Sequence, residues 1–97
     1  MDEFDGFEWD EQKSERCFRE RQFDFEFAAR LFHVTRVEWE DKRSDHGETR
    51  FVTVGEVDAR MITVVWTPRN AARRIISARP ASRHERKIFD GEHSTEQ

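Results

Sequence analysis

The sequence predicts a single α+β domain, and three observations carry that prediction. Residues 60–67 and 73–79 are two apolar, β-branched runs separated by a short segment with Pro68, which indicates a pair of buried strands. Residues 34–42 and 49–57 are expected to form two further strands, and the links between the four are short, so they should make an antiparallel meander. Capped helical segments stand on both sides of these strands, and helices set apart from an antiparallel sheet define the α+β class.

Composition and length fit one small folded unit. The chain has 97 residues, of which 39% are charged and 35% hydrophobic, and its nine Phe and three Trp supply much of the core. One cysteine excludes an internal disulfide, and no Cys or His spacing resembles a metal site, so no metal or other cofactor is expected. No signal peptide or membrane-spanning run is apparent, which makes the cytoplasm the expected location. We expect a domain over residues 1–91 and a flexible polar tail over 92–97.

The N-terminal third predicts a weak strand and two helices. Residues 4–9 contain Gly6 and form an edge strand at best. Asp10 is suited to cap a charged surface helix over residues 11–21, with Cys17 as a small core residue. Asp24 is suited to cap a second helix that ends near residue 32 or 33. Its apolar residues follow helical spacing, and a small staple is expected before its first turn: Phe25, Ala28, Ala29 and Phe32 form the stripe, and Phe23 with Ala28 the staple.

The C-terminal part predicts side-chain directions and a last helix. If the strand over 73–79 is regular, Ile75 and Arg79 lie on the same face of the sheet. Residues Ser82 and Glu85 have the spacing of a capping box, which opens a helix that should end near Gly91. Trp66 is expected in the core, with base stacking as the alternative.

The two halves of the chain differ in charge. Residues 1–48 hold 8 basic and 15 acidic side chains, a net charge of −7, whereas residues 49–97 hold 9 basic and 6 acidic ones, a net charge of +3. A phosphate-binding face should therefore draw mainly on the second half. A solvated arginine-rich surface is the alternative interpretation.

Four segments of the chain together carry a resemblance to a known family. They are Phe7-Glu8-Trp9-Asp10 with Lys13; Phe25-x-x-Ala28-Ala29-Arg30-x-Phe32; Glu40-Asp41-x-Arg43 with His46-Gly47-Glu48-x-Arg50; and Arg74-Ile75-Ile76-Ser77-Ala78-Arg79 with Ala81-Ser82-Arg83-x-Glu85. In this order and at this spacing they resemble the BrnT family of bacterial type II toxins over residues 7 to about 89. The resemblance implies a RelE-like fold and ribonuclease activity without a metal. It also implies neutralisation by a BrnA-like ribbon-helix-helix antitoxin, in a heterotetramer that binds operator DNA.

The chain departs from the family pattern at three places. Many members carry Lys-His-Gly between the first two helices, where this chain has Glu20-Arg21-Gln22. A basic residue often follows the Ile-Ser-Ala-Arg run, but here Pro80 does, and Trp66 stands where Tyr is common. If the inter-helix His acts in RNA cleavage elsewhere, Arg21 must serve in its place or cleavage must be poor.

The chemistry of a metal-free ribonuclease names the candidate catalytic residues. One group must take the proton of the 2′-hydroxyl, one must stabilise the phosphorane charge, and one must protonate the leaving oxygen. Arginine suits the second task, because its planar fork meets phosphate oxygens and stays charged. His46 and Glu48 are the expected proton handlers, and the arginine candidates are Arg43, Arg50 and Arg79.

Each candidate also has a structural interpretation. Asp45-His46-Gly47 is favourable turn chemistry, Glu48 is able to pair with a neighbouring arginine, and Arg79 is able to pair with Asp41 or Glu40. Six further basic residues are candidates for RNA binding, although Lys13 without the resemblance would be a surface residue, and the basic side of the last helix could instead receive an acidic antitoxin segment. The six are Lys13, Arg21, Arg74, Arg83, Arg86 and Lys87.

Two hypotheses of different kinds follow. The first is a ribonuclease toxin that a partner holds in check. The second is a binding module of the same fold, whose cleavage activity has decayed and which acts only through its antitoxin or co-repressor partner. The retained arginines favour the first, and the replaced inter-helix segment favours the second.

Overall fold

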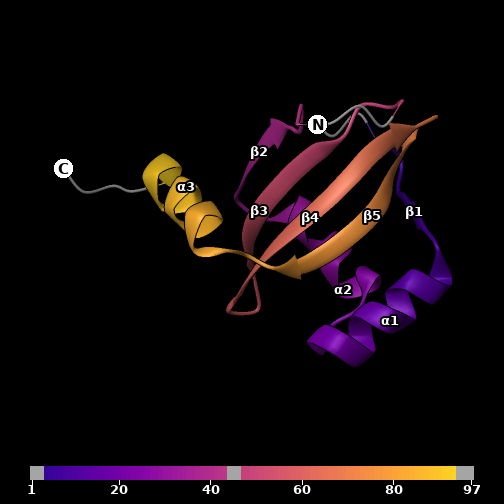
Figure 1. The fold of residues 1–97 in the computed structure, drawn as a ribbon, viewed down its shortest axis with the longest axis horizontal. Coiled ribbons are helices and arrows are strands. Elements are labelled where there is room, and N and C mark those ends of the chain that lie inside the picture. The colour runs from indigo at the N-terminus through magenta and orange to yellow at the C-terminus, as the bar shows by residue number, and fades with distance from the viewer. Residues whose placement is uncertain (1–3, 44–46, 94–97) are drawn as a thin grey trace.

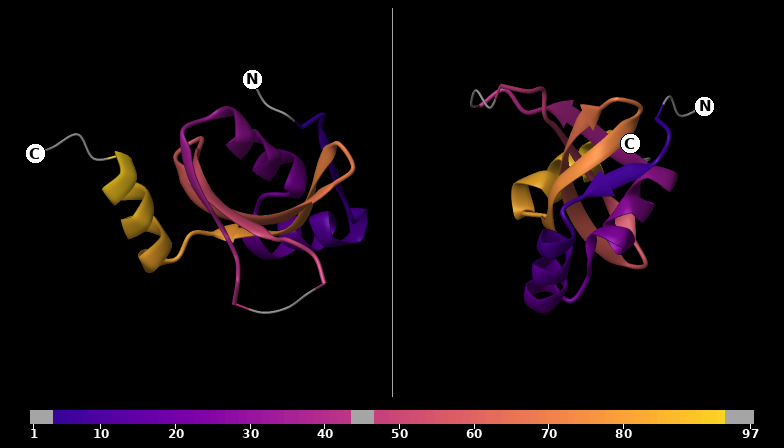
Figure 2. Two further views of the ribbon diagram at one scale, coloured as in Figure 1. Left: turned by 90° about the horizontal axis from the view of Figure 1, so that it is seen from above. Right: turned by 90° about the vertical axis from the view of Figure 1, so that its right-hand side faces the viewer.

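A five-stranded sheet with helices on both faces forms the domain. The computed structural model describes residues 4–43 and 47–93. Figure 1 shows the arrangement, and Figure 2 shows the sheet curving around α2 while α3 lies outside the curve. None of the described helices is long and apolar enough to span a membrane. In chain order the elements are β1 (Phe7–Trp9), α1 (Glu11–Arg21), α2 (Phe25–Ala29), the 3-10 helix η1 (Arg30–His33), β2 (Arg36–Glu40), β3 (Phe51–Val57), β4 (Arg60–Arg69), β5 (Ala72–Pro80) and α3 (Arg83–His93).

The sheet is mixed, with the order β1-β5-β4-β3-β2. Strands β2 to β5 pair antiparallel in sequence order, as the short links predict. The description as a four-stranded antiparallel meander is nevertheless incomplete, because β1 adds a fifth strand that runs parallel to β5. Phe7 and Trp9 of β1 pack against the core cluster, which explains how so short a strand is held at the sheet edge.

Both N-terminal helices begin at the predicted caps. The Asp10 carboxylate accepts a hydrogen bond from the Gln12 N–H, and the Asp24 carboxylate accepts one from the Phe27 N–H, both at 2.9 Å. The second helical segment is α-helical only to Ala29 and continues as the tighter η1 to His33. Phe23 packs its ring against Phe27, at 5.5 Å between centroids, at the start of this segment.

The face of the sheet toward α1 and α2 is aromatic. Trp66 lies at its centre and is 2% exposed, so the prediction of a core residue is confirmed. Its ring contacts those of Phe4, Phe32 and Phe51, and its Nε1–H donates to Thr53 Oγ1 at 2.9 Å. Buried aromatic rings with a satisfied polar group contribute large apolar area without an unpaired donor. This face therefore supplies most of the core.

Cys17 and Gly55 show how closely the helices approach this face. Cys17 is buried, and its Sγ–H donates to the Ala78 carbonyl at 3.4 Å, as expected of a small core residue. A Cβ atom on Gly55 would collide with the Leu31 side chain, so β3 needs glycine here for η1 to pack against it.

The face toward α3 holds a smaller apolar cluster. Its buried members are Val37, Val52 and Val54, and Ile88 and Phe89 of α3 pack against them. α3 runs on to His93, two residues beyond the predicted end near Gly91. The remainder of the predicted tail, residues 94–97, lies outside the described residues.

A β-bulge in β5 changes which residues share a face. Val65 pairs with Ser77 but Trp66 pairs with Ile75, so Ile76 has no partner across the strand pair. The prediction that Ile75 and Arg79 lie on one face is therefore wrong. Ile75 is buried on the side of α1 and α2, and Arg79 points to the side of α3.

Candidate functional site

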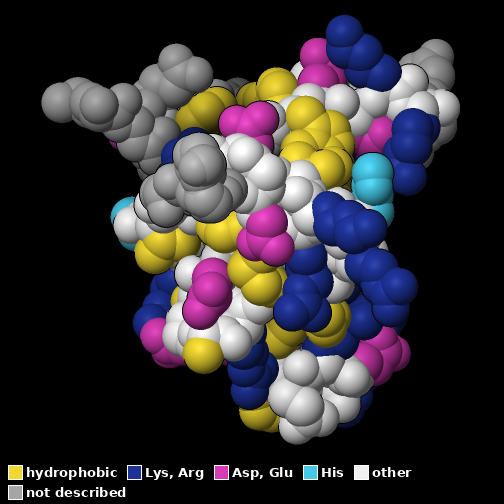
Figure 3. All heavy atoms as spheres, turned by 90° about the vertical axis from the view of Figure 1, so that its left-hand side faces the viewer, with side chains coloured by type: hydrophobic (Ala, Val, Ile, Leu, Met, Phe, Trp, Pro, Cys, Tyr) yellow, Lys and Arg dark blue, Asp and Glu magenta, His cyan; other side chains and the backbone are white. Residues whose placement is uncertain are grey.

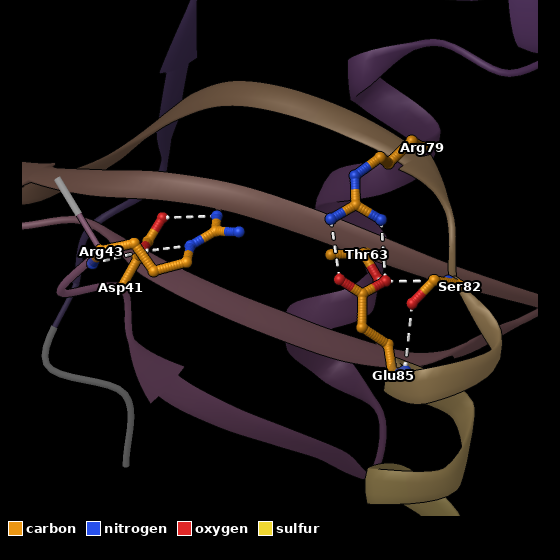
Figure 4. Close-up of polar contacts among 6 residues, drawn as sticks. All are labelled: Asp41, Arg43, Thr63, Arg79, Ser82 and Glu85. Atoms are coloured by element: carbon orange, nitrogen blue, oxygen red, sulfur yellow. Dashed lines mark hydrogen bonds and ion pairs between the residues drawn. The ribbon is translucent and has the colours of Figure 1, made fainter.

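The centre of the candidate site is an ion pair between β5 and α3. Arg79 Nη1–H and Nη2–H donate to Glu85 Oε1 and Oε2, each at 2.7 Å (Figure 4). Thr63 of β4 donates its hydroxyl to the same Oε1 at 2.8 Å. The side chain of Arg79 is 35% exposed and that of Glu85 is 11% exposed. The guanidinium is thus fixed from one side and open to solvent on another.

Local sequence explains why Glu85 lies at this place. Ser82 Oγ accepts a hydrogen bond from the Glu85 N–H at 3.1 Å, and the Ser82 N–H donates to Glu85 Oε1 at 2.9 Å. This is the predicted capping box at the start of α3. The helix start therefore aims the carboxylate back at the sheet.

The hydrogen bonds determine the charge states of the pair. The Arg79 guanidinium, with the Ser82 N–H and the Thr63 hydroxyl, lowers the pKa of Glu85 from 4.5 to about 2 against the opposing effect of burial. The hydrogen bond to Glu85 raises the pKa of Arg79. Both groups are consequently charged at neutral pH.

Arg43 is held near this pair by a different carboxylate. Its Nε–H and Nη2–H donate to Asp41 Oδ1 and Oδ2 at 2.9 and 3.0 Å. The Asp41 N–H is itself fixed to the Arg50 carbonyl at 2.8 Å. The Arg43 side chain is 83% exposed. While Glu85 raises the pKa of Arg79, the positive charge of Arg43 acts in the opposite direction with a smaller effect. Two guanidinium groups therefore lie on one side of the sheet (Figure 4).

The predicted partners of Arg79 are wrong. Asp41 binds Arg43, and Glu40 pairs with Phe51 on β3, whose ring stacks on Trp66 on the opposite side of the sheet. Arg79 instead binds Glu85. Strand alternation is the physical reason for Glu40, which lies on the face opposite Arg79. Asp41 instead binds an arginine only two residues away in sequence.

The segment before β3 holds two more candidates. Arg50 Nε–H donates to Glu48 Oε2 at 3.1 Å, with the side chains 25% and 33% exposed. The structural interpretation of Glu48, a pair with a neighbouring arginine, therefore describes the observed contact. His46 lies outside the described residues.

The six candidates for RNA binding do not form one surface. Arg74 binds Glu8 at 3.2 Å, and Glu8 is also 4.0 Å from Arg69. Lys13 and Arg21 line a separate hollow between α1 and the middle of β5. The remaining three are exposed on α3: Arg83, Arg86 and Lys87. Figure 3 shows Lys and Arg side chains gathered along one side of the face that it draws.

Sequence reasoning missed two features of these faces. It assigns Glu85 only as a helix cap. A capping glutamate that follows Arg79 so closely in the sequence is nevertheless a signal that the two side chains meet. Arg73 is 4% exposed, with its guanidinium carbon 4.3 Å from the Phe32 ring centroid and 4.6 Å from that of Phe4. Nothing in the local pattern distinguishes this buried arginine from Arg74.

No group of three or more His, Cys, Asp or Glu side chains suited to a metal ion occurs within residues 4–43 and 47–93. The described site consists of arginines and the carboxylates that orient them. Such a site is suited to binding a phosphate through charge-assisted hydrogen bonds.

Comparison with known proteins identifies the class to which this fold and site belong. Among solved structures, the chain is similar to the 1.1 Å crystal structure of the Brucella abortus ribonuclease toxin BrnT, with 25% sequence identity and a TM-score of 0.64. The similarity covers 80% of this chain and 97% of that chain. No curated protein sequence matches the chain. The fold is thus that of a ribonuclease toxin.

The family follows from the sequence model described as "Ribonuclease toxin, BrnT, of type II toxin-antitoxin system", which matches residues 9–85. The chain belongs to this BrnT family, and the resemblance in its motifs is confirmed. Membership of a type II system implies an antitoxin partner.

Proposed function

We propose that this chain is a toxin that cleaves RNA without a metal ion and thereby inhibits translation. The observation that carries the proposal is the Arg79 guanidinium, fixed by two 2.7 Å hydrogen bonds and accompanied by the exposed Arg43. Family membership supplies the reaction class.

The arginines are suited to stabilise the charge that develops during cleavage. Attack of the 2′-hydroxyl on the adjacent phosphorus places extra negative charge on the phosphate oxygens. Preorganised donors that meet this charge contribute more than mobile ones, because they need no reorganisation during the reaction. Glu85 holds Arg79, and Asp41 holds the more exposed Arg43, so both guanidinium groups are oriented by protein carboxylates.

Proton transfer is assigned to the segment between β2 and β3. His46 and Glu48 are the proposed pair that removes the 2′-hydroxyl proton and returns one to the 5′-oxygen as it leaves. Glu48 retains partial exposure beside Arg50. Arg50 is proposed to orient Glu48 through the hydrogen bond between them.

The remaining basic residues are proposed to guide the RNA backbone. Arg74 lies on the same face of the sheet as Arg79, and α3, which packs on that face, carries three exposed basic residues. Lys13 and Arg21 would contact a more distant part of the strand. Binding should accordingly weaken as salt concentration rises.

The proposed partner is a BrnA-like ribbon-helix-helix antitoxin. It would neutralise the toxin in the cytoplasm as a heterotetramer and bind operator DNA through its own fold. The family membership of this chain supports an antitoxin. The ribbon-helix-helix type, the stoichiometry and the DNA binding are parts of the proposal.

Purified protein and controlled expression test the proposal together. Expression of the chain alone in a bacterial host should slow growth and lower bulk translation, and co-expression of the antitoxin should restore both. Purified protein should cut RNA with EDTA present. Soluble, folded protein that leaves growth and RNA intact but still binds its antitoxin would instead identify a catalytically decayed binding module.

A further inference from the structure

We propose that Glu85 is a positioning residue for RNA cleavage, which holds the Arg79 guanidinium in the orientation that receives the scissile phosphate. The inference rests on the proposed function and adds a residue from α3 to its site. The role of Glu85 is to act through Arg79 and not to contact the RNA.

The contacts of Glu85 come from three separate parts of the fold. Oε1 accepts from Arg79 of β5, from Thr63 of β4 and from the Ser82 N–H before α3, and Oε2 accepts a second bond from Arg79. A carboxylate held at this many points has little freedom to rotate. The guanidinium plane is therefore fixed by the sheet and the helix together.

Arg79 retains donors for a phosphate while it binds Glu85. A guanidinium carries five N–H donors, and Glu85 uses one on each terminal nitrogen. The bonds to Glu85 leave about three N–H groups unused, and the side chain is 35% exposed. A phosphate is thus able to approach the outer edge of the group without displacing Glu85.

Burial separates Glu85 from an ordinary capping glutamate. The capping box needs a single hydrogen bond from the Ser82 N–H to the Glu85 carboxylate, and this function is fulfilled equally well at an exposed helix start. Here Glu85 is buried and uses both oxygens on Arg79. Burying a carboxylate is costly without such partners, so its placement serves the arginine as well as the helix.

A double-mutant cycle between Glu85 and Arg79 tests the inference. The variants are Glu85→Gln, Arg79→Lys and the pair, and single-turnover RNA cleavage is measured for each under conditions where all are folded. Glu85→Gln keeps the shape and the acceptor oxygen but loses the charge that grips the guanidinium. We expect cleavage to fall about tenfold to hundredfold in Glu85→Gln, and at most about threefold further when the change is added to Arg79→Lys.

Asp24→Ala is the matched control. It removes the carboxylate that caps α2, on the face of the sheet opposite Arg79, and leaves the Arg79 and Glu85 contacts in place. We expect a lower melting temperature with an unchanged cleavage rate. If Glu85→Gln does not fold, Thr63→Val replaces it, since this change removes one hydrogen bond to Oε1 and no charge, and cleavage should then fall several-fold.

The pH profile of cleavage separates a positioning role of Glu85 from a role in proton transfer. In Glu85→Gln the rate should fall at every pH while the profile keeps its shape. Loss of one limb of the profile would identify Glu85 as a proton donor or acceptor and overturn the inference. Unchanged or faster cleavage in Glu85→Gln, or equal losses in both backgrounds of the cycle, would also overturn it.

The wild-type control separates this inference from the proposed function. If wild type cuts RNA and Glu85→Gln cuts equally well, only the positioning role fails. If wild type does not cut, affinity for a 2′-O-methyl RNA is compared instead. If Glu85→Gln weakens RNA binding in the wild-type background but not in the Arg79→Lys background, Glu85 positions Arg79 for binding even though the chain does not cleave. If the wild-type chain does not bind the RNA at all, both the positioning role and the proposed function are overturned.

Discussion

Each face of the sheet has an arginine of β5, and the two arginines have different surroundings. Arg73 and Arg79 both belong to β5, but Arg73 lies among aromatic rings on the side of α1 and α2. Arg79 lies on the side of α3, where a carboxylate holds it. Glu85 fixes both the plane and the direction of the Arg79 donors, because its carboxylate accepts a hydrogen bond from each terminal nitrogen. Arginine content alone therefore does not locate the site; the surroundings of each arginine do.

The difference also separates stability from chemistry. The aromatic face buries large apolar area and should dominate the free energy of unfolding. The α3 face buries less and carries the polar network. Changes on the two faces should consequently appear in different measurements.

Trp66→Ala should lower the free energy of unfolding more than any other change considered, because it removes the central ring of the aromatic face. Removal of a fully buried aromatic side chain costs about 3–5 kcal/mol, a large share of the stability of a small domain. Urea denaturation should show the loss, and folded protein that remains at low temperature should cleave RNA at the wild-type rate. The control is Trp39→Ala on the α3 face, where the partly buried side chain should cost less. Similar losses in both variants would contradict the comparison.

Arg79→Lys, compared with Arg73→Lys, tests the two arginines directly. Lysine keeps the charge but loses the fork. Arg79→Lys should lose about 2–4 kcal/mol of transition-state stabilisation in RNA cleavage, the range for removal of one preorganised donor. Arg73→Lys should lower stability and leave the cleavage rate of the folded protein unchanged. Thermal melts and cleavage rates measured side by side give the result, and a reversed pattern would mean that the faces have been assigned the wrong roles.

Gly55→Ala tests how tightly η1 packs on the aromatic face, the face toward α1 and α2. The new Cβ would collide with the Leu31 side chain, so overpacking should cost about 1–3 kcal/mol. Gly91→Ala is the matched control, because an added Cβ there would meet open space and alanine favours a helix. We expect Gly91→Ala to be neutral or slightly stabilising in the same denaturation assay. A neutral Gly55→Ala would show that η1 packs loosely against β3.

The ion pair on the α3 face should make a smaller contribution to the free energy of unfolding, and one that depends on pH. The pKa of Glu85 is lowered from 4.5 to about 2 in the folded chain, so its contribution to stability is complete above pH 4.5. This contribution should disappear progressively as pH falls from 4.5 to about 2, because the unfolded state then binds the proton more tightly. Glu85→Gln has no such titration, so the stability difference between the two proteins should shrink over this range. A difference that stays constant with pH would contradict the assigned ion pair.

Local signals in the sequence predict most elements of this fold. Asp10 and Asp24 cap helices where expected, and the Ser82–Glu85 spacing marks the start of α3. These features depend on residues close together in the chain, where side-chain and backbone geometry leave few choices. The parallel pairing of β1 with β5 depends on contacts between distant segments, and a three-residue strand carries too little pattern to reveal its partner.

The candidate site is less predictable for the same reason. The sequence points to Arg79 and Arg43 as functional candidates, but it does not assign the carboxylates that hold them. Asp41, which together with Glu40 is the alternative partner that the sequence offers for Arg79, instead binds Arg43, two residues away. The sequence assigns Glu85 only to its own helix, and its contact with Arg79 depends on the direction of the chain after Pro80 and on the bulge at Ile76.

The unpaired Ile76 has a consequence for the permitted length of the chain. The bulge holds one residue more than regular pairing needs, so a deletion of Ile76 would place the Trp66–Ile75 and Val65–Ser77 pairs next to each other without a gap. Arg79 would keep its direction toward α3, because the alternation of side chains after the deletion is that of a regular strand. A residue inserted between Ile75 and Arg79 cannot be accommodated by the existing bulge. Without a second bulge, it would turn the guanidinium toward the apolar core. Natural variation in this segment should therefore include the loss of one residue more readily than the gain of one.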